Sequence, residues 1–189
     1  GRYLDSDNDG ICYRTYPGTH PEKGAYFTRG TSHDEYARYT EDGNINAQTL
    51  TRLMRKFRTA TDLVPEPIIE INGEDSCGVI YYGSSKPAVL EAKDILKTKN
   101  INLDLMQIRS FPFNLDVWEF IANHDRIYVV EQNRDSQMRT LIMAEGGISA
   151  EILRPLVHFT GDPIEASYIV NKISEREVNY KSHKNIKER

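Results

Sequence analysis

RIYVVEQNRDSQMRTLI, residues 126–142, predicts a buried β-strand, a short polar loop and an amphipathic helix in direct succession. The residues from Ile127 to Val130 are β-branched or aromatic and show no polar alternation, which is typical of a strand covered on both faces in a parallel sheet. Apolar residues then recur at spacings of three and four, as on one face of a helix, and Asp135 stands where it can cap that helix. This order of elements predicts an α/β domain.

The polar corner between this strand and this helix is Glu131-Gln132-Asn133-Arg134-Asp135. In an open α/β sheet, ligands and partners bind in the crevice beyond the carboxyl ends of the strands. The corner would lie at that edge. Its side chains therefore form either a functional site or a well-capped turn.

Strand and helix patterns alternate along the chain from residue 67 onward. The first strand, at 67–71, begins with a proline, which suits an edge position. The Asn72-Gly73 turn after it suits a hairpin, in which case this strand runs antiparallel to its neighbour. The alternation predicts a mostly parallel sheet, with four parallel strands and this edge strand. The other expected strands are 78–82, 103–108, 127–131 and 155–159, and the expected helices are 87–99, 115–123, one ending near 144, and 164–177.

Before the sheet, the spacing of apolar residues predicts an amphipathic helix at 46–63 that ends at the following prolines. We expect its apolar face to consist of Leu50, Leu53, Met54 and Phe57 and its outer side to be basic.

The first 43 residues are rich in glycine, tyrosine, threonine and aspartate and hold no lasting helical or alternating pattern. A structureless stretch of this length is unusual inside a compact domain, so we interpret it as an irregular connecting arm that packs on something else. The expected organisation is an arm at 1–43, a domain at 44–178 and a polar tail at 179–189 that frays.

Composition excludes several classes of protein. The 189 residues carry a net charge of -4 and a pI of about 5.8, which disfavours duplex nucleic acid as a partner. No apolar run approaches the roughly 18 residues that a membrane span needs, so no membrane partner is expected. Cys12 and Cys77 form neither a metal-binding spacing nor a disulfide framework, and no secretory signal is visible. We therefore expect a cytoplasmic protein.

A candidate metal site lies near the start of the chain, where Asp5, Asp7, Asp9 and Gly10 match the first half of an EF-hand calcium loop. The second half does not match, because Tyr16 stands where a bidentate glutamate is required. We favour an Asp-rich turn whose side chains bond to the local backbone, and leave weak occupancy by calcium or magnesium open.

Other motifs give weaker signals. Gly83-Ser84-Ser85 follows a strand and precedes a helix, as an anion cradle would, but it lacks a complete phosphate-binding motif, so we expect Ser85 to cap the helix. The five histidines show no metal-binding spacing. No complete catalytic constellation is present, which suggests one part of a larger enzyme.

Six blocks of sequence, spread in order along nearly the whole chain, form a recognisable set. The blocks are YRTYPGT at 13–19, GAYFTRGTSHDE at 24–35, YTEDG at 39–43, VIYYGS at 79–84, RSFPF at 109–113 and VVEQNRD at 129–135. Together they resemble the alpha subunit of 2-oxoacid:ferredoxin oxidoreductases, above all the 2-oxoglutarate type. The resemblance implies the C-terminal region of that subunit, which has a transketolase C-terminal-like fold. That fold is a three-layer α/β/α domain with a mixed, mostly parallel five-stranded sheet.

The resemblance also implies a function for the assembled enzyme. The family oxidatively decarboxylates a 2-oxoacid with coenzyme A, using thiamine diphosphate, magnesium and iron–sulfur clusters, and reduces ferredoxin. No diphosphate-binding motif or cluster cysteines occur here, so no cofactor is expected in this fragment. Its implied partners are the remaining domains of the subunit and a thiamine-binding beta subunit. The implied role is non-catalytic, in subunit assembly and active-site enclosure; the alternative is an independent α/β module that binds a small ligand.

Under this interpretation the polar corner and the arm are docking surfaces that hold the domain against its neighbours. Glu131→Ala and Arg134→Ala would then weaken assembly and leave the isolated fold intact. The expected docking residues are Arg14, Thr19, Arg29, His33, Glu131, Asn133, Arg134 and Asp135.

Overall fold

The computed structural model describes residues 2–24, 32–73 and 76–187. The chain divides into two compact units, Gly1–Val64 and Pro65–Arg189. The expected boundary at 43/44 is therefore displaced, because helix α1 (Gly43–Ala60) belongs with the arm. The physical reason is that side chains of α1 bond to the start of the arm, as described below. Among the helices of these described ranges, none has the length and apolarity that crossing a membrane requires.

Unit 2 is built on one mixed sheet of five strands in the order β1-β3-β2-β4-β5. β1 runs antiparallel to β3 and every other neighbouring pair is parallel, which confirms the predicted sheet. The predicted hairpin is wrong, because β1 pairs with β3 and not with the strand that follows it; residues 74–75 of that connection lie outside the described part. The strands are β1 (Ile68–Glu70), β2 (Cys77–Tyr82), β3 (Leu103–Ile108), β4 (Ile127–Glu131) and β5 (Leu153–Val157).

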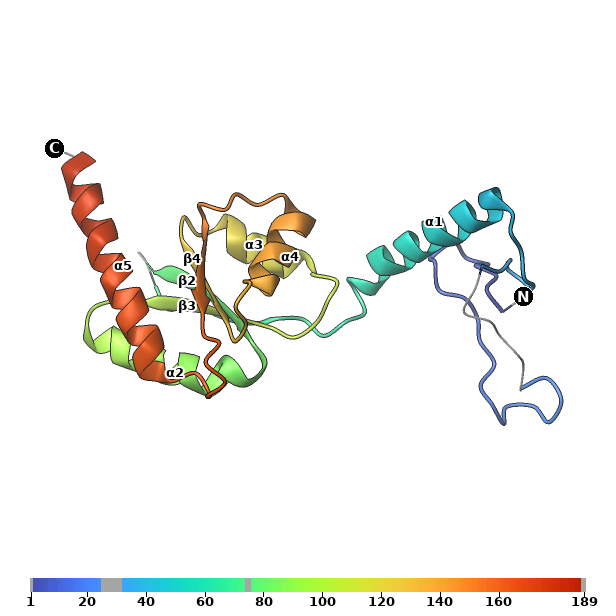
Figure 1. Ribbon diagram of the computed structural model, residues 1–189, viewed down its shortest axis with the longest axis horizontal. Coiled ribbons are helices and arrows are strands. Elements are labelled where there is room, and N and C mark those ends of the chain that lie inside the picture. The colour runs from blue at the N-terminus through green and yellow to red at the C-terminus, as the bar shows by residue number, and fades with distance from the viewer. Residues whose placement is uncertain (1, 25–31, 74–75, 188–189) are drawn as a thin grey trace. The chain divides into compact units, whose positions relative to one another are not determined.

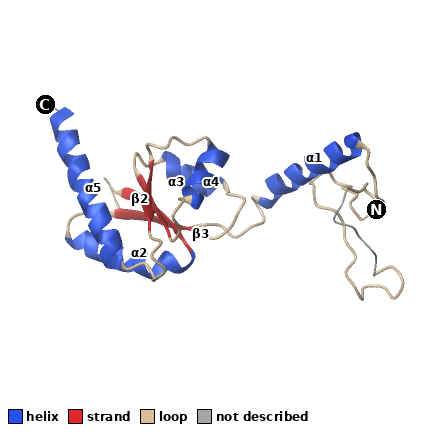
Figure 2. Cartoon of the chain, in the orientation of Figure 1, coloured by secondary structure: helices blue, strands red, loops and turns tan. Residues whose placement is uncertain are grey.

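Helices cover both faces of this sheet, which gives the three layers that the sequence predicted (Figures 1 and 2). A short 3-10 turn, η1 (Gly83–Ser85), leads from β2 into the helix that follows it. α2 and α5 pack together on one face, and α3 and α4 lie on the other (Figure 1). The helices are α2 (Lys86–Thr98), α3 (Leu115–Ala122), α4 (Gln137–Gly146) and α5 (Ala166–Lys187).

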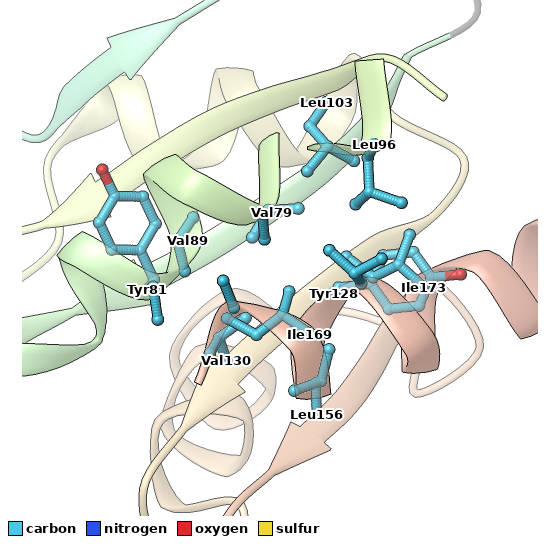
Figure 3. Close-up of a cluster of buried hydrophobic side chains, with 14 of the residues drawn as sticks. Val79, Tyr81, Val89, Leu96, Leu103, Tyr128, Val130, Leu156, Ile169 and Ile173 are labelled. Carbon is cyan, nitrogen blue, oxygen red and sulfur yellow. The ribbon is translucent and has the colours of Figure 1, made fainter. Parts of the chain in front are cut away.

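Each face of the sheet has its own apolar core. Figure 3 shows the core under α2 and α5, where side chains of β2, β3, β4 and β5 point toward the two helices. Tyr128 and Val130 of β4 belong to this core, while Ile127 and Val129 belong to the core under α3 and α4. The strand is thus buried on both faces, as its unbroken apolar run predicted.

Two predicted boundaries in the last quarter of the chain are wrong. β5 begins and ends two residues earlier than expected and holds Pro155 in its interior. A proline is tolerated there because β5 is an edge strand and pairs only with β4. The tail from 179 does not begin a frayed segment, since α5 continues to Lys187 and the Tyr180 hydroxyl donates to Asp125 Oδ2 at 2.5 Å.

Candidate functional site

The carboxyl edge of the sheet is the first candidate site. β3 and β4 lie on opposite sides of β2, so the connections that leave β2 and β4 diverge to opposite faces. This is the switch point at which open α/β sheets bind ligands. The η1 turn follows β2 there, and the polar corner 131–135 follows β4.

Glu131 ends β4, and its side chain is fully buried. Oε2 accepts hydrogen bonds from Asn133 Nδ2 and from the backbone N–H of Met138, both at 2.8 Å, and Oε1 accepts one from the backbone N–H of Arg139 at 3.0 Å. The carboxylate therefore satisfies two first-turn donors of α4 and complements the positive end of that helix. The expectation that Asp135 caps α4 is wrong. The capping side chain is that of Glu131, which lies at the end of β4.

Asn133 completes this cap. Its Oδ1 accepts hydrogen bonds from the backbone N–H groups of Asp135 and Gln137, each at 3.1 Å, and its Nδ2 also lies 3.3 Å from the Tyr82 hydroxyl. Ser136, between the two donors, adopts a left-handed backbone with φ of 51°. Burial, followed by the nearby Glu131 charge, raises the pKa of Tyr82, so this hydroxyl stays protonated at neutral pH.

Gln132 bridges the switch point itself. Its Nε2 lies 3.0 Å from Ser84 Oγ and 3.2 Å from Ser85 Oγ, and its Oε1 accepts from the backbone N–H of Ile164 at 3.4 Å. The Ser85 hydroxyl makes no capping bond to α2, so the predicted serine cap is wrong. One glutamine thus ties together the loops after β2, β4 and β5, and a ligand entering the crevice would have to displace it.

The outer part of the corner faces solvent. Arg134 Nε lies 2.7 Å from Asp135 Oδ1, and their side chains are 74% and 56% exposed. Arg134 and Asp135, together with Gln132, are the exposed residues of the corner. The docking role of the corner remains a prediction, and Glu131 would serve it only indirectly, by holding α4.

A carboxylate–histidine pair at the opposite edge of the sheet has the composition of a catalytic dyad. His124 Nε2 lies 3.1 Å from Asp104 Oδ2, and His124 Nδ1 lies 2.7 Å from the Phe120 carbonyl oxygen. Asp104 Oδ1 accepts from the backbone N–H of Asn72 at 2.7 Å. Both ring nitrogens have protein partners and both side chains are buried, so the pair is structural.

In unit 1 the structure brings together the three aspartates of the candidate metal site. One oxygen from each of Asp5, Asp7 and Asp9 lies within 4.8 Å of the others. Both oxygens of Asp5 lie 3.1 Å from the Gly10 backbone nitrogen, and Asp9 Oδ1 accepts from the backbone N–H of Ile11 at 2.6 Å. These are the local backbone bonds expected of an Asp-rich turn.

A cation already faces this turn, and it comes from the chain itself. Arg55 Nη1 lies 2.6 Å from Asp5 Oδ2 and also bonds to Asn8 Oδ1. Arg52 Nη1 donates to the Gly10 carbonyl at 2.9 Å. Arg52 and Arg55, which bond to the turn, lie on α1, more than forty positions further along the sequence. No local motif could therefore have indicated them.

A pocket of about 370 Å³ lies between this turn and α1, within unit 1. That volume is in the range of small-molecule sites, but four of its charged side chains, those of Asp5, Asp34, Arg52 and Arg55, are already bonded to each other or to the backbone. The lining residues are Tyr3, Asp5, Asp34, Glu35, Tyr36, Ile45, Gln48, Thr49, Arg52 and Arg55.

Two of the predicted docking residues of the arm, His33 and Thr19, contact different neighbours. The His33 ring stacks on Tyr3 with centroids 3.8 Å apart, and Thr19 Oγ1 accepts from the Tyr16 backbone N–H at 3.2 Å. Arg14 is exposed, while Arg29 lies outside the described residues. His33 is thus part of the packing of unit 1, and Arg14 and Thr19 remain accessible.

The class defined by this structure is a three-layer α/β/α domain with a mixed five-stranded sheet, preceded by an arm and a helix. No family model matches the chain. It is 28% identical over 176 residues to subunit alpha of 2-oxoacid:ferredoxin oxidoreductase 2 from Aeropyrum pernix, covering 88% of this chain and 26% of that protein. It is 29% identical over 160 residues to subunit alpha of 2-oxoacid:ferredoxin oxidoreductase 1 from Sulfurisphaera tokodaii, covering 82% and 24%.

A solved structure agrees with the fold. A 2-oxoglutarate:ferredoxin oxidoreductase from Magnetococcus marinus, determined with 2-oxoglutarate, coenzyme A and succinyl-CoA bound, superposes with a TM-score of 0.76 at 22% identity. The superposition covers 92% of this chain and 30% of that one. The predicted resemblance is confirmed, since proteins named as 2-oxoacid:ferredoxin oxidoreductase alpha subunits match most of this chain. The chain spans about a quarter of the length of the curated relatives it matches.

Proposed function

We propose that this chain is the C-terminal part of the alpha subunit of a 2-oxoacid:ferredoxin oxidoreductase, with a role in assembly and active-site enclosure. The observation that carries the proposal is the match to alpha subunits over 88% of this chain, against 26% of the relative's length. The polar groups at the switch point support a non-catalytic role, because Glu131 and Gln132 are used to join neighbouring loops.

The substrate proposed for the assembled enzyme is 2-oxoglutarate. The Magnetococcus marinus protein, whose fold matches, was determined with 2-oxoglutarate, coenzyme A and succinyl-CoA. In the proposed reaction the 2-oxoacid loses CO2, its acyl group is transferred to coenzyme A, and ferredoxin accepts the electrons. The partners are then the rest of the alpha subunit, a thiamine-binding beta subunit and ferredoxin.

The iron–sulfur cluster implied for such an enzyme does not fit this chain. An iron–sulfur cluster is held by several cysteine thiolates, and the sequence has two cysteines, Cys12 in unit 1 and Cys77 in unit 2, both buried. Burial raises the pKa of the Cys77 thiol to about 12, which opposes the thiolate form that a metal requires. We therefore assign the cluster to other parts of the complex. We propose the same place for thiamine diphosphate and its magnesium, because the sequence has no complete diphosphate-binding motif.

Two measurements test the proposal. The alpha subunit that contains this chain, purified with its partner subunit, is expected to reduce ferredoxin in a reaction that requires both 2-oxoglutarate and coenzyme A. The 189-residue chain alone is expected to show no heat of binding with thiamine diphosphate and magnesium. Tight cofactor binding by the chain alone would overturn the proposed non-catalytic role. Turnover of another 2-oxoacid, with none of 2-oxoglutarate, would overturn the proposed substrate.

A further inference from the structure

Helix α1 has two faces of opposite character. Leu50, Met54 and Phe57, which we call the α1 stripe, fall within about 60° of the helix circumference. Their exposed fractions are 54%, 62% and 54%. The sequence predicted that the apolar face of this helix would be the covered one. Within unit 1 its fourth predicted member, Leu53, is half-buried, whereas the three side chains of the stripe are more than half exposed.

The arm binds the other side of α1. Arg55 pairs with Asp5 at 2.6 Å, Arg52 donates to the Gly10 carbonyl, and the Thr59 hydroxyl donates to the Asp9 carbonyl. At 100° per residue these three side chains point away from the stripe. The basic face that was expected to be solvated is therefore occupied by the chain's own acidic turn.

Gly10 allows the backbone of the acidic turn to approach the backbone of α1 closely. A Cβ at this position would lie 2.3 Å from the Lys56 backbone nitrogen, and the backbone φ of +86° favours glycine. The turn therefore sits directly against the backbone of α1, and the orientation of the helix relative to the turn is fixed with the stripe facing outward.

Unit 1 has almost no apolar core of its own. Within its described ranges, 2–24 and 32–64, Cys12 is the one apolar residue whose side chain is buried. A chain segment of this size needs a core, a metal, disulfides or a partner to stay folded. Large exposed apolar side chains are abundant instead: Tyr13, Tyr16, Tyr36, Tyr39, Leu50, Met54, Phe57 and Leu63.

We infer that the α1 stripe is the face on which unit 1 docks against the remainder of the alpha subunit. The inference rests on the proposed function, because the occupant is the part of the subunit outside this chain. About three quarters of the Aeropyrum pernix relative lies outside the aligned region, which supplies a partner of sufficient size. Since the stripe carries no charge, the occupant presents an uncharged apolar groove or helix face.

Thiol labelling tests this docking. Met54→Cys is a small change on an exposed position, and the native Cys12 and Cys77 are buried, so a maleimide reports on position 54. We expect rapid labelling in the 189-residue chain and labelling slower by about tenfold or more in the complete subunit, each relative to the unfolded protein. Thr51→Cys, on the same helix but off the stripe, is the matched control and is expected to be slowed much less.

Each other outcome decides against the inference. Equal protection of positions 51 and 54 in the complete subunit would show that the stripe is not the docking face. Protection of position 54 already in the 189-residue chain would assign the stripe to unit 2, or to a second copy if the protection depends on concentration. The labelling is independent of turnover, so a failure of the proposed enzyme activity is seen separately.

Discussion

Arg126 and Glu177 form a buried ion pair that joins the start of β4 to α5, with Arg126 Nε 2.9 Å from Glu177 Oε2. Their side chains are 6% and 2% exposed. The second carboxylate oxygen of Glu177 accepts from the Tyr128 hydroxyl at 2.8 Å, and the Arg126 guanidinium lies 4.3 Å from the centre of the Tyr180 ring. Burial and then the Glu177 carboxylate raise the pKa of Tyr128, so its hydroxyl remains a donor.

Glu177→Ala is expected to destabilise unit 2 by about 3–5 kcal/mol, because it leaves a buried arginine without its main partner. Urea unfolding followed by circular dichroism measures the change. Glu175→Ala, on the same helix at an exposed position, is the matched control and is expected to change stability by less than about 0.5 kcal/mol. Equal effects of the two substitutions would show that the pair contributes little to the fold.

The sheet was largely predictable because its strands are buried runs. β3 and β4 lie where the sequence placed them. Residues 127–130 of β4 are an unbroken apolar run buried on both faces, and β3 is mostly apolar and buried, with Asp104 and Gln107 as its polar residues. β5 was misplaced by two residues because Arg154 and Pro155 interrupt its pattern, and an edge strand tolerates both. The ion pair between Arg126 and Glu177 could not be predicted, because it joins residues 51 positions apart.

The residues of the candidate sites were predictable from the sequence, but the contacts that these residues make were not. The corner after β4 was located correctly, but Glu131 caps α4 from the strand where a local Asp135 cap was expected. Periodicity identified both faces of α1 and could not tell which face the arm would cover. That choice depends on Asp5 and Arg55, which meet only in the folded unit.

Glu131→Gln is expected to destabilise the fold by about 1–3 kcal/mol, since the charged acceptor of two α4 backbone donors is lost. This revises the expectation that substitutions at Glu131 leave the fold intact. Trp118, the chain's single tryptophan, packs on the core under α3 and α4, so its fluorescence during urea unfolding measures the change. Arg134→Ala, at a 74% exposed position, is the control and is expected to leave the midpoint unchanged. If Glu131→Gln also leaves it unchanged, the strand-end cap is not a source of stability.

Cys77 is expected to make the protein less stable as pH rises above 9. Burial raises the pKa of this thiol from 9.0 to about 12. Between these values the unfolded thiol loses its proton while the folded one keeps it, so rising pH favours the unfolded state. The contribution amounts to about 1.4 kcal/mol per pH unit for one proton.

Comparison with Cys77→Ala isolates this effect from that of the tyrosines. The substitution costs stability at pH 7 by leaving a small cavity, but it is expected to flatten the dependence of the free energy of unfolding on pH between 9 and 11. Urea titrations at several pH values measure both slopes. Identical slopes in the two proteins would assign the alkaline loss to other groups, such as Tyr128.

The Asp5-Asp7-Asp9 turn is expected to respond to calcium only after its internal cation is removed. Arg55 neutralises Asp5 at 2.6 Å, so in the wild-type protein about 1 mM calcium is expected to raise the Tm by less than about 1 °C. In Arg55→Ala the three carboxylates repel one another, and calcium can relieve this repulsion by binding to them. We therefore expect calcium to raise the Tm of that variant by several degrees, as measured by differential scanning calorimetry.

Two further variants make this result specific. Arg58→Ala removes an exposed cation from the same helix and is expected to behave as the wild type does. Asp7→Ala added to Arg55→Ala is expected to abolish the calcium response, because Asp7 would supply one of the three oxygens. A calcium-dependent rise in the wild-type Tm that Asp7→Ala abolishes would instead establish the turn as a metal site in the native protein, with Arg55 as an accessory to it.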